Sequence, residues 1–82
     1  MSAESVAVEH YSKKFGSSPE KAFIHFAKEL GELARGIEKN QPEVARLEIT
    51  EMAALLFFFA SLYSFDLLKN VEELYKKKLE QK

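Results

Sequence analysis

The 82-residue sequence contains no cysteine, only three glycines and two prolines, and almost no net charge, with 12 basic against 13 acidic residues. Without cysteine the chain can form neither a disulfide framework nor a thiolate metal site, and this suits a reducing compartment. The charge balance argues against binding nucleic acid through a broad basic surface. A single domain is expected, because the chain is too short for two hydrophobic cores.

Membrane insertion and secretion are not expected either. The longest apolar run, Met52 to Ala60, is too short to span a bilayer and is better interpreted as part of a buried helix. Residues 1–10 lack the basic start and the apolar stretch of a signal peptide. We therefore expect a cytoplasmic protein that has neither a membrane nor a nucleic acid as its partner.

The sparse glycines and prolines divide the chain into helical segments, and no segment alternates as a strand does. The expected helices cover residues 3–14, 19–39, 42–63 and 67–80. The second helix should start either at a capping box of Ser17 and Glu20, or at a cap by Ser18 with Pro19 in the first helical position. Asp66 is the expected cap of the fourth helix.

Each expected helix carries apolar residues that should be buried. In the second helix they recur at i, i+3, i+4 and i+7, which is typical of one buried face. The residues expected inside are Val6, Tyr11 and Phe15 in the first helix, Phe23, Phe26, Ala27, Leu30, Leu33, Ala34 and Ile37 in the second, and Leu67, Leu68, Val71, Leu74 and Tyr75 in the fourth.

The third helix is apolar all round in its second half, so it needs cover on every side. One small chain can hardly provide that cover, and Phe57, Phe58 and Phe59 are therefore expected in the core and in a subunit interface. Stacking on a nucleobase is the less favoured alternative for these three rings. We predict a homodimer or homotetramer in which the helices pack as a bundle.

The predicted fold class is all-α, an antiparallel helical hairpin with flanking helices that forms a bundle by oligomerisation. The short turn near Asn40 should fold the second and third helices back on each other. The expected single domain, residues 1–82, consists of an N-terminal helix and linker over 1–18, the hairpin over 19–68 and a C-terminal helix over 69–82.

Two pairs of glutamates are spaced i, i+3, so each pair shares one face of its helix. Glu29 and Glu51 lie eleven residues on either side of Asn40, and Glu32 and Glu48 lie eight residues on either side. An antiparallel hairpin would therefore bring the four carboxylates to one level. Four carboxylates cannot all stay ionised there without a counter-charge, and an all-oxygen site favours Mg²⁺ or Mn²⁺.

A plainer interpretation of the same glutamates stays open. Glutamate is a good helix former, and chance i, i+3 pairs are common in helices. Glu29 and Glu32 can be solvated, and Glu48 can pair with Arg46 or Lys28.

Residues 19–68 resemble the MazG-like nucleotide pyrophosphohydrolases, an all-α family with an E-E-x-x-E motif on one helix and an E-x-x-D motif on the next. The first motif is matched by Lys28-Glu29-Leu30-Gly31-Glu32, and the second by Glu48-Ile49-Thr50-Glu51. "GELARGI" and "SFDL" also resemble the family. Lys28 replaces the leading glutamate, Glu51 replaces aspartate, and the lysine- and asparagine-bearing segment that follows in the family is not clearly matched.

The resemblance implies magnesium- or manganese-dependent hydrolysis of a nucleoside triphosphate to its monophosphate and pyrophosphate, in the removal of non-standard or excess nucleotides. It also implies that Glu29, Glu32, Glu48 and Glu51 are both the metal ligands and the catalytic residues. Phosphoribosyl-ATP pyrophosphohydrolase, from the same superfamily, is an alternative whose motif surroundings fit less well. Another alternative is a degenerate member that keeps the fold for self-association or partner binding.

Four further residues are candidate substrate contacts: His25, Lys28, Arg35 and Lys69. His25 lies one helical turn before Glu29, although the sequence favours an edge-of-core or interface histidine at this position. The three cationic side chains are able to hold phosphate oxygens, but each also fits a solvated surface position. The Lys76–Lys78 run can close over a substrate or simply end a solvated helix.

Overall fold

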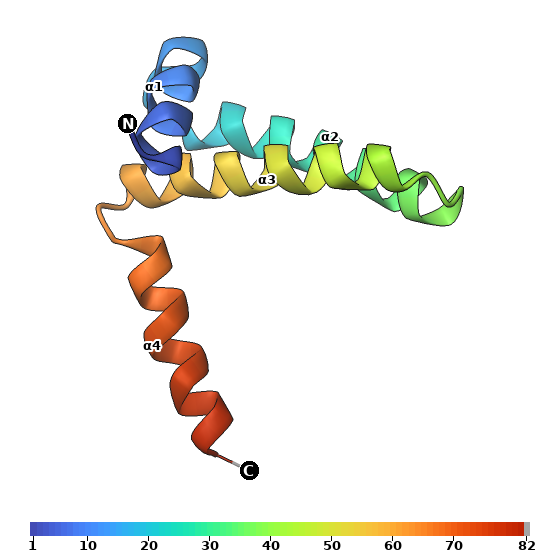
Figure 1. Cartoon of the computed structure of the whole chain (residues 1–82). Helices are drawn as coiled ribbons and strands as arrows, with labels where there is room; N and C mark the ends of the chain where they lie inside the picture. Colours follow the sequence, from blue (N-terminus) through green and yellow to red (C-terminus); the bar gives the residue numbers. More distant parts are fainter. Residues whose placement is uncertain (82) are drawn as a thin grey trace.

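A computed structural model describes residues 1–81 and confirms the all-α fold class (Figure 1). Within this part of the chain the helices are α1 (Ala3–Phe15), α2 (Pro19–Glu38), α3 (Pro42–Leu62) and α4 (Leu67–Glu80). The expected helix boundaries differ from these by at most one residue. Lys82, which ends the predicted C-terminal helical segment, lies outside the described residues.

Local side-chain chemistry explains where the helices begin. Ser18 is the cap of α2, because its hydroxyl accepts a hydrogen bond from the Lys21 backbone N–H at 3.2 Å, and Pro19 occupies the first turn. Of the two starts considered from the sequence, the cap by Ser18 is therefore the one that forms. Asp66 caps α4 as expected, since its carboxylate accepts from the Lys69 N–H at 3.1 Å.

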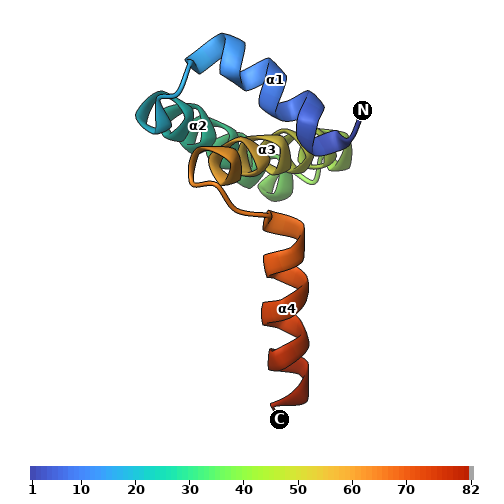
Figure 2. The ribbon, with the colours of Figure 1, turned by 90° about the vertical axis from the view of Figure 1, so that its left-hand side faces the viewer.

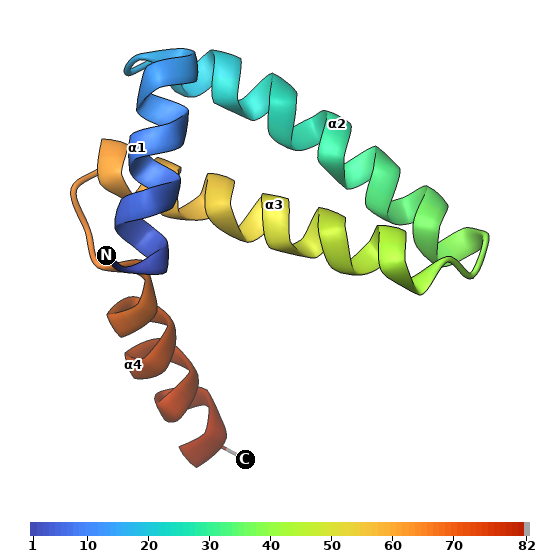
Figure 3. The same cartoon turned by 45° about the horizontal axis from the view of Figure 1, so that its top comes forward.

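The turn between α2 and α3 reverses the chain, so that α3 returns alongside α2 (Figures 1 and 3). Asn40 adopts a positive φ of 55°, and the Gln41 N–H donates to the Gly36 carbonyl at 2.8 Å, which is a Schellman-type helix end. Gly36 also permits close packing here, because a Cβ at this position would lie 3.0 Å from Cγ1 of Val44.

The core forms where α1 crosses the α2–α3 pair. Tyr11, Ala22, Leu55 and Phe58 are buried in one cluster, and Leu55 and Phe58 are completely inaccessible to solvent. The half-buried aromatic rings of Phe15, Phe26 and Phe59 pack against this cluster. Phe58 therefore belongs to the core of its own chain, and the expectation that it also forms a subunit interface is wrong.

The expected buried face of α2 is wrong in part. Phe23, Leu30 and Ile37 are more than half exposed, whereas small residues such as Ala22 and Gly36 lie against α3. Helices α2 and α3 approach each other closely where the side chains between them are small. The bulky apolar residues of α2 therefore lie on its flank and not in the contact with α3. In α1, Tyr11 is buried as expected, but Val6 is 48% exposed.

The expected burial of α4 is also wrong for the single chain. Every residue of α4 except Leu67 is exposed, and the helix has almost no contact with α1, α2 or α3. Within the described residues no single helix is long and apolar enough to cross a bilayer; α3 and α4 together meet that test by length and composition but are bent by 100°. The molecule therefore has an L shape, with α4 as one arm (Figure 1).

Candidate metal centre

Three of the four predicted glutamates converge between α2 and α3. Glu29 from α2, and Glu48 and Glu51 from α3, each offer a carboxylate oxygen, and these oxygens all lie within 4.8 Å of one another. The convergence follows from local geometry, because Glu48 and Glu51 are one turn apart on the same helix face. The reversal at Asn40 brings that face level with Glu29.

Two of these carboxylates are buried. Glu29 is 5% exposed and Glu48 is 4% exposed, while Glu51 is half-buried. Among residues 1–81, Oε1 of Glu48 has no hydrogen-bond partner. A buried carboxylate oxygen without a partner lowers the stability of the folded protein. A cation or a hydrogen-bond donor is needed to stabilise it. This oxygen is the strongest structural indication of a ligand at the site.

The proximity of the carboxylates changes their pKa values. The adjacent Glu29 carboxyl and burial raise the pKa of Glu48 to about 8. Glu29 and burial also raise the pKa of Glu51. The pKa of Glu29 is lowered, mainly because protonated Glu48 can donate a hydrogen bond to it. Without a cation the cluster therefore holds protons at neutral pH, and a divalent cation would replace them.

The chemistry of the donors fits a hard cation. Carboxylate oxygens from two helices, without sulfur or imidazole in the trio, match the preference of Mg²⁺ or Mn²⁺ for oxygen ligands. Glu32, the fourth predicted ligand, is half-buried and close enough to Glu48 to raise the pKa of that carboxyl, but it lies outside the trio.

His25 lies beside the cluster. Its Nε2 is 3.7 Å from Oε1 of Glu29, and its ring packs against Tyr11 and Phe15 with centroid distances of 6.2 and 5.6 Å. The imidazole is thus held between the aromatic core and a candidate metal ligand. Lys28 is exposed, and its charge contributes to the lowered pKa of Glu29.

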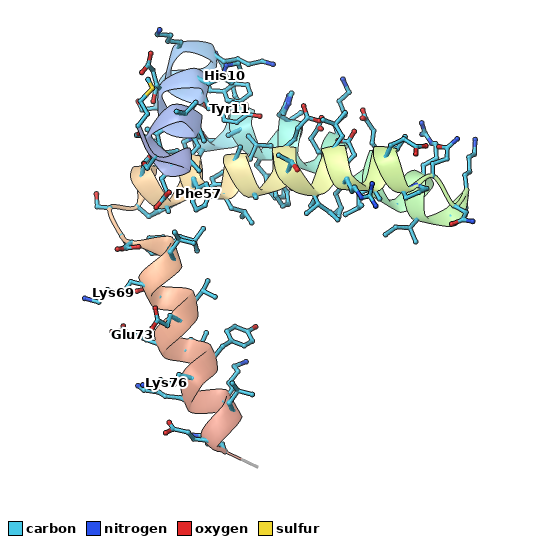
Figure 4. The ribbon with its side chains drawn as sticks, viewed as in Figure 1. His10, Tyr11, Phe57, Lys69, Glu73 and Lys76 are labelled. Atoms are coloured by element: carbon cyan, nitrogen blue, oxygen red, sulfur yellow. The ribbon has the colours of Figure 1, made fainter. Side chains whose placement is uncertain are left out.

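Among the described residues, the other two candidate substrate contacts form no ion pair with the carboxylates. Arg35 is exposed in the last turn of α2, where its charge is favourable to the helix dipole. Lys69 is exposed on the outer side of α4, together with Glu73 and Lys76 (Figure 4). Within one chain this side faces away from α2 and α3.

A cavity that was not predicted from the sequence adjoins the cluster. It has a volume of about 810 Å³ between α1 and α3, and its lining includes Glu51. His10, Tyr11 and Phe57, which are labelled in Figure 4, also line it. Burial, and then the charges of Glu51 and Glu29, raise the pKa of Tyr11, which places this phenol beside the carboxylates. Tyr11 was expected to point inward, but no pattern in the sequence indicated that α1 would pack near Glu51.

No protein-family model, no curated protein and no solved structure matches this chain. The resemblance to MazG-like enzymes therefore stays a prediction that rests on the glutamate motifs. The case for a functional site rests on the geometry described above.

Proposed function

We propose that this protein is a magnesium-dependent pyrophosphohydrolase that converts a nucleoside triphosphate into its monophosphate and pyrophosphate. The observation that carries the proposal is the convergence of Glu29, Glu48 and Glu51, with an unpartnered buried oxygen on Glu48. Mg²⁺ keeps part of its coordination sphere for water and phosphate oxygens, so a carboxylate cluster of this kind suits a phosphorylated substrate.

The glutamates would hold the cation and align a water molecule. Bound there, Mg²⁺ would neutralise the phosphate charge and make the α-phosphorus more electrophilic. The oxygen of the water forms a bond to the α-phosphorus, the bond from that phosphorus to the bridging oxygen breaks, and pyrophosphate leaves. A carboxylate of the cluster accepts the proton of the attacking water.

The cavity between α1 and α3 supports the choice of a nucleotide. It adjoins the carboxylates at Glu51, and Tyr11, His10 and Phe57 contribute rings to its lining. A nucleobase offers a flat π face that stacks on such rings, while the triphosphate extends toward the glutamates. His25 and Lys28 are the predicted substrate contacts that act on Glu29, whereas Arg35 lies one helical turn after Glu32 and Lys69 lies on α4.

The proposal places the activity in the cytoplasm, in a homodimer or homotetramer that removes non-standard or excess nucleotides. The absence of cysteine is compatible with a reducing compartment. A partner chain is supported by the large apolar side chains that a single chain leaves exposed.

The test is to incubate the protein with Mg²⁺ and a panel of nucleoside triphosphates, and to measure pyrophosphate and orthophosphate separately. We expect pyrophosphate, and we expect Glu48→Gln to abolish its release together with the thermal stabilisation by Mg²⁺. Glu38→Gln is the matched control, because Glu38 is exposed on α2 outside the cluster and its loss should leave both unchanged. Orthophosphate as the first product would contradict the proposed reaction.

An interaction module without catalysis is the second candidate. The observation that favours it is the extent of exposed apolar surface, which includes Phe23, Ile37 and Tyr63, each more than 60% exposed. This candidate predicts no pyrophosphate with any nucleotide and no thermal shift with Mg²⁺ or Mn²⁺. Pyrophosphate release that depends on Glu48 would exclude it.

A further inference from the structure

Among residues 1–81, two apolar surfaces have no cover from the rest of the chain. The first is the open face of the α2–α3 pair, which we define by Phe23, Leu30 and Ile37 of α2 and Leu56 and Tyr63 of α3. These side chains are 44–67% exposed. They border the seam where the half-buried rings of Phe26 and Phe59 meet at a centroid distance of 6.3 Å. Exposed apolar patches of this extent in small proteins mark interaction sites.

The second uncovered surface is the apolar face of α4, whose exposed members are Leu68, Val71, Leu74, Tyr75 and Leu79. Lys69, Glu73 and Lys76 occupy the opposite side of the helix (Figure 4). A helix of 14 residues is only marginally stable alone in water, so α4 needs a surface on which to bury this face.

The two surfaces line the same inner angle of the L. Residues nine apart on a helix point in opposite directions, so Phe23 lies on the flank of α2 opposite Glu32 and the carboxylates. Helix α1 covers the carboxylate side, and α4 projects from the other side of the pair (Figure 2). Because Lys69, Glu73 and Lys76 point out of the angle, the apolar face of α4 points into it (Figure 4).

We propose that two copies of this chain interlock, with α4 of each copy packed on the open face of the other. The dimensions agree: Phe23 to Ile37 spans about 21 Å at 1.5 Å per residue, and the 14 residues of α4 span about the same length. The exchange is reciprocal, as a two-fold dimer requires, and each copy gives and receives the same helix.

The area is sufficient for a stable dimer. At roughly 100 Å² for each half-exposed large apolar side chain, the open face and α4 together bury on the order of 1,000 Å² per site. A two-fold pair contains two such sites, and about 2,000 Å² in total falls in the range of stable interfaces. A near-neutral chain, with a net charge of −1, adds little repulsion between copies.

The turn before α4 argues against cover by the chain's own helix. The Phe65 N–H donates to the Ala60 carbonyl at 3.1 Å, Ser64 has a positive φ of 58°, and Asp66 caps α4 at once. These bonds end α3 and start α4 within four residues, at a bend of 100°. To fold back on the open face of its own chain, α4 would have to break this turn. The α4 of a second copy can reach the same face while the turn stays intact.

The test uses the absence of native cysteine. Two single-cysteine chains, Leu30→Cys and Leu74→Cys, are mixed under denaturing conditions, refolded together and oxidised. We expect a cross-linked heterodimer, because Leu30 is central in the open face and Leu74 is central in α4. The matched control replaces Leu74→Cys with Glu73→Cys, its neighbour on the outer side of α4, and should give at least tenfold less cross-link.

Sedimentation of the full chain gives an independent measurement. The unaltered protein should be a dimer at micromolar concentration, and Leu74→Asp should weaken dimerisation at least tenfold while α1–α3 stay helical. Glu73→Gln should have no effect.

A monomeric unaltered protein would overturn the proposal, as would a dimer in which Leu74→Cys cross-links no better than Glu73→Cys. A chain carrying both Leu30→Cys and Leu74→Cys that closes on itself would also overturn it, in favour of a folded-back α4. None of these outcomes depends on hydrolysis, so the dimer and the proposed reaction can fail separately.

Discussion

The two sides of the α2–α3 pair differ in how they are covered. On one side α1 packs over the pair, Tyr11 and Phe58 form a buried aromatic cluster, and the carboxylates gather beside it. On the other side Phe23, Leu30 and Ile37 stay exposed, although they belong to the most regular apolar stripe of the sequence. Helix α1 covers most of the closed side within residues 1–81, and no described helix covers the open side.

This difference shows what an apolar pattern can and cannot predict. A stripe at helical spacing predicts that a face will be buried, but not which surface buries it. In α2 the contact with α3 uses small residues, Ala22 and Gly36, because small side chains let the helices approach. The larger residues are then left exposed on the flank of α2.

The largest expected effect is on the closed side. Phe58→Asp places an unpaired carboxylate in a completely buried position and removes a ring from the core, which should cost about 4 kcal/mol or more. The free energy of unfolding of a domain this size is only about 4–12 kcal/mol, so we expect the far-UV circular dichroism of the helices to be largely lost. Leu30→Asp, on the open side, should lose at most the contribution of α4 to the helical signal, since Leu30 is already 51% exposed within one chain. Equal loss of structure in both variants would refute the distinction between the two sides.

The next effect concerns the carboxylates of the closed side. Glu32 lies beside the trio and close to Glu48, so Glu32→Gln should lower the rate of pyrophosphate release roughly 10- to 100-fold, as changes next to metal ligands do. The fold should be unchanged, because Glu32 is only half-buried. Steady-state rates are compared with those of Glu38→Gln, which alters an exposed glutamate of the same helix. Equal rates in Glu32→Gln and Glu38→Gln would show that Glu32 has no role in the reaction.

Helix boundaries and the all-α class were predictable from the sequence because their causes are local. Ser18 and Asp66 bond to backbone groups three residues away, so their role depends on few other residues. The trio was largely predictable for a related reason. Glu29 and Glu51 are equally distant from Asn40, and any tight reversal there brings them to one level.

The remainder depends on contacts that no short window of sequence contains. Leu68 and Val71 were expected to be buried, yet both are about half exposed in the single chain. The cavity beside Glu51 depends on the angle at which α1 crosses α3, which follows from the packing of Tyr11 against Phe58. The resemblance to a known family indicated a metal site but did not indicate this packing.

A smaller effect is expected where α2 and α3 approach most closely. Gly36→Val should destabilise the protein by about 1–3 kcal/mol, because even a Cβ would lie 3.0 Å from Cγ1 of Val44 and 3.3 Å from the Ala45 nitrogen. Gly31→Val is the matched control on the same helix, since a Cβ there meets nothing within 4 Å. Urea unfolding followed by circular dichroism measures both. If the two variants were equally stable, close approach at Gly36 would not be needed.

The smallest and most specific effect is a dependence of stability on pH that the closed side alone should produce. The pKa of Glu48 is raised to about 8 and that of Glu51 is also raised, so above the ordinary glutamate pKa the folded protein binds more protons than the unfolded chain. With a chelator present, these groups should therefore make the free energy of unfolding fall as the pH rises from about 5 to 8. The lowered pKa of Glu29 acts in the opposite direction, at more acidic pH.

Thermal melts of the unaltered protein and of Glu48→Gln isolate this effect, because both proteins keep His10 and His25 and differ only at the cluster. The decrease in stability toward pH 8 should be smaller in Glu48→Gln. Mg²⁺ binds the ionised cluster and displaces its protons, so the stabilisation that it gives should grow with pH in the unaltered protein. Variants of the open side, such as Leu30→Asp, should retain both dependences when compared as monomers, since that side contributes no carboxylate to the trio. If stability fell equally with pH in the unaltered protein and in Glu48→Gln, Glu48 would not be the proton-binding group. The carboxylate cluster would then not be the cause of the pH dependence.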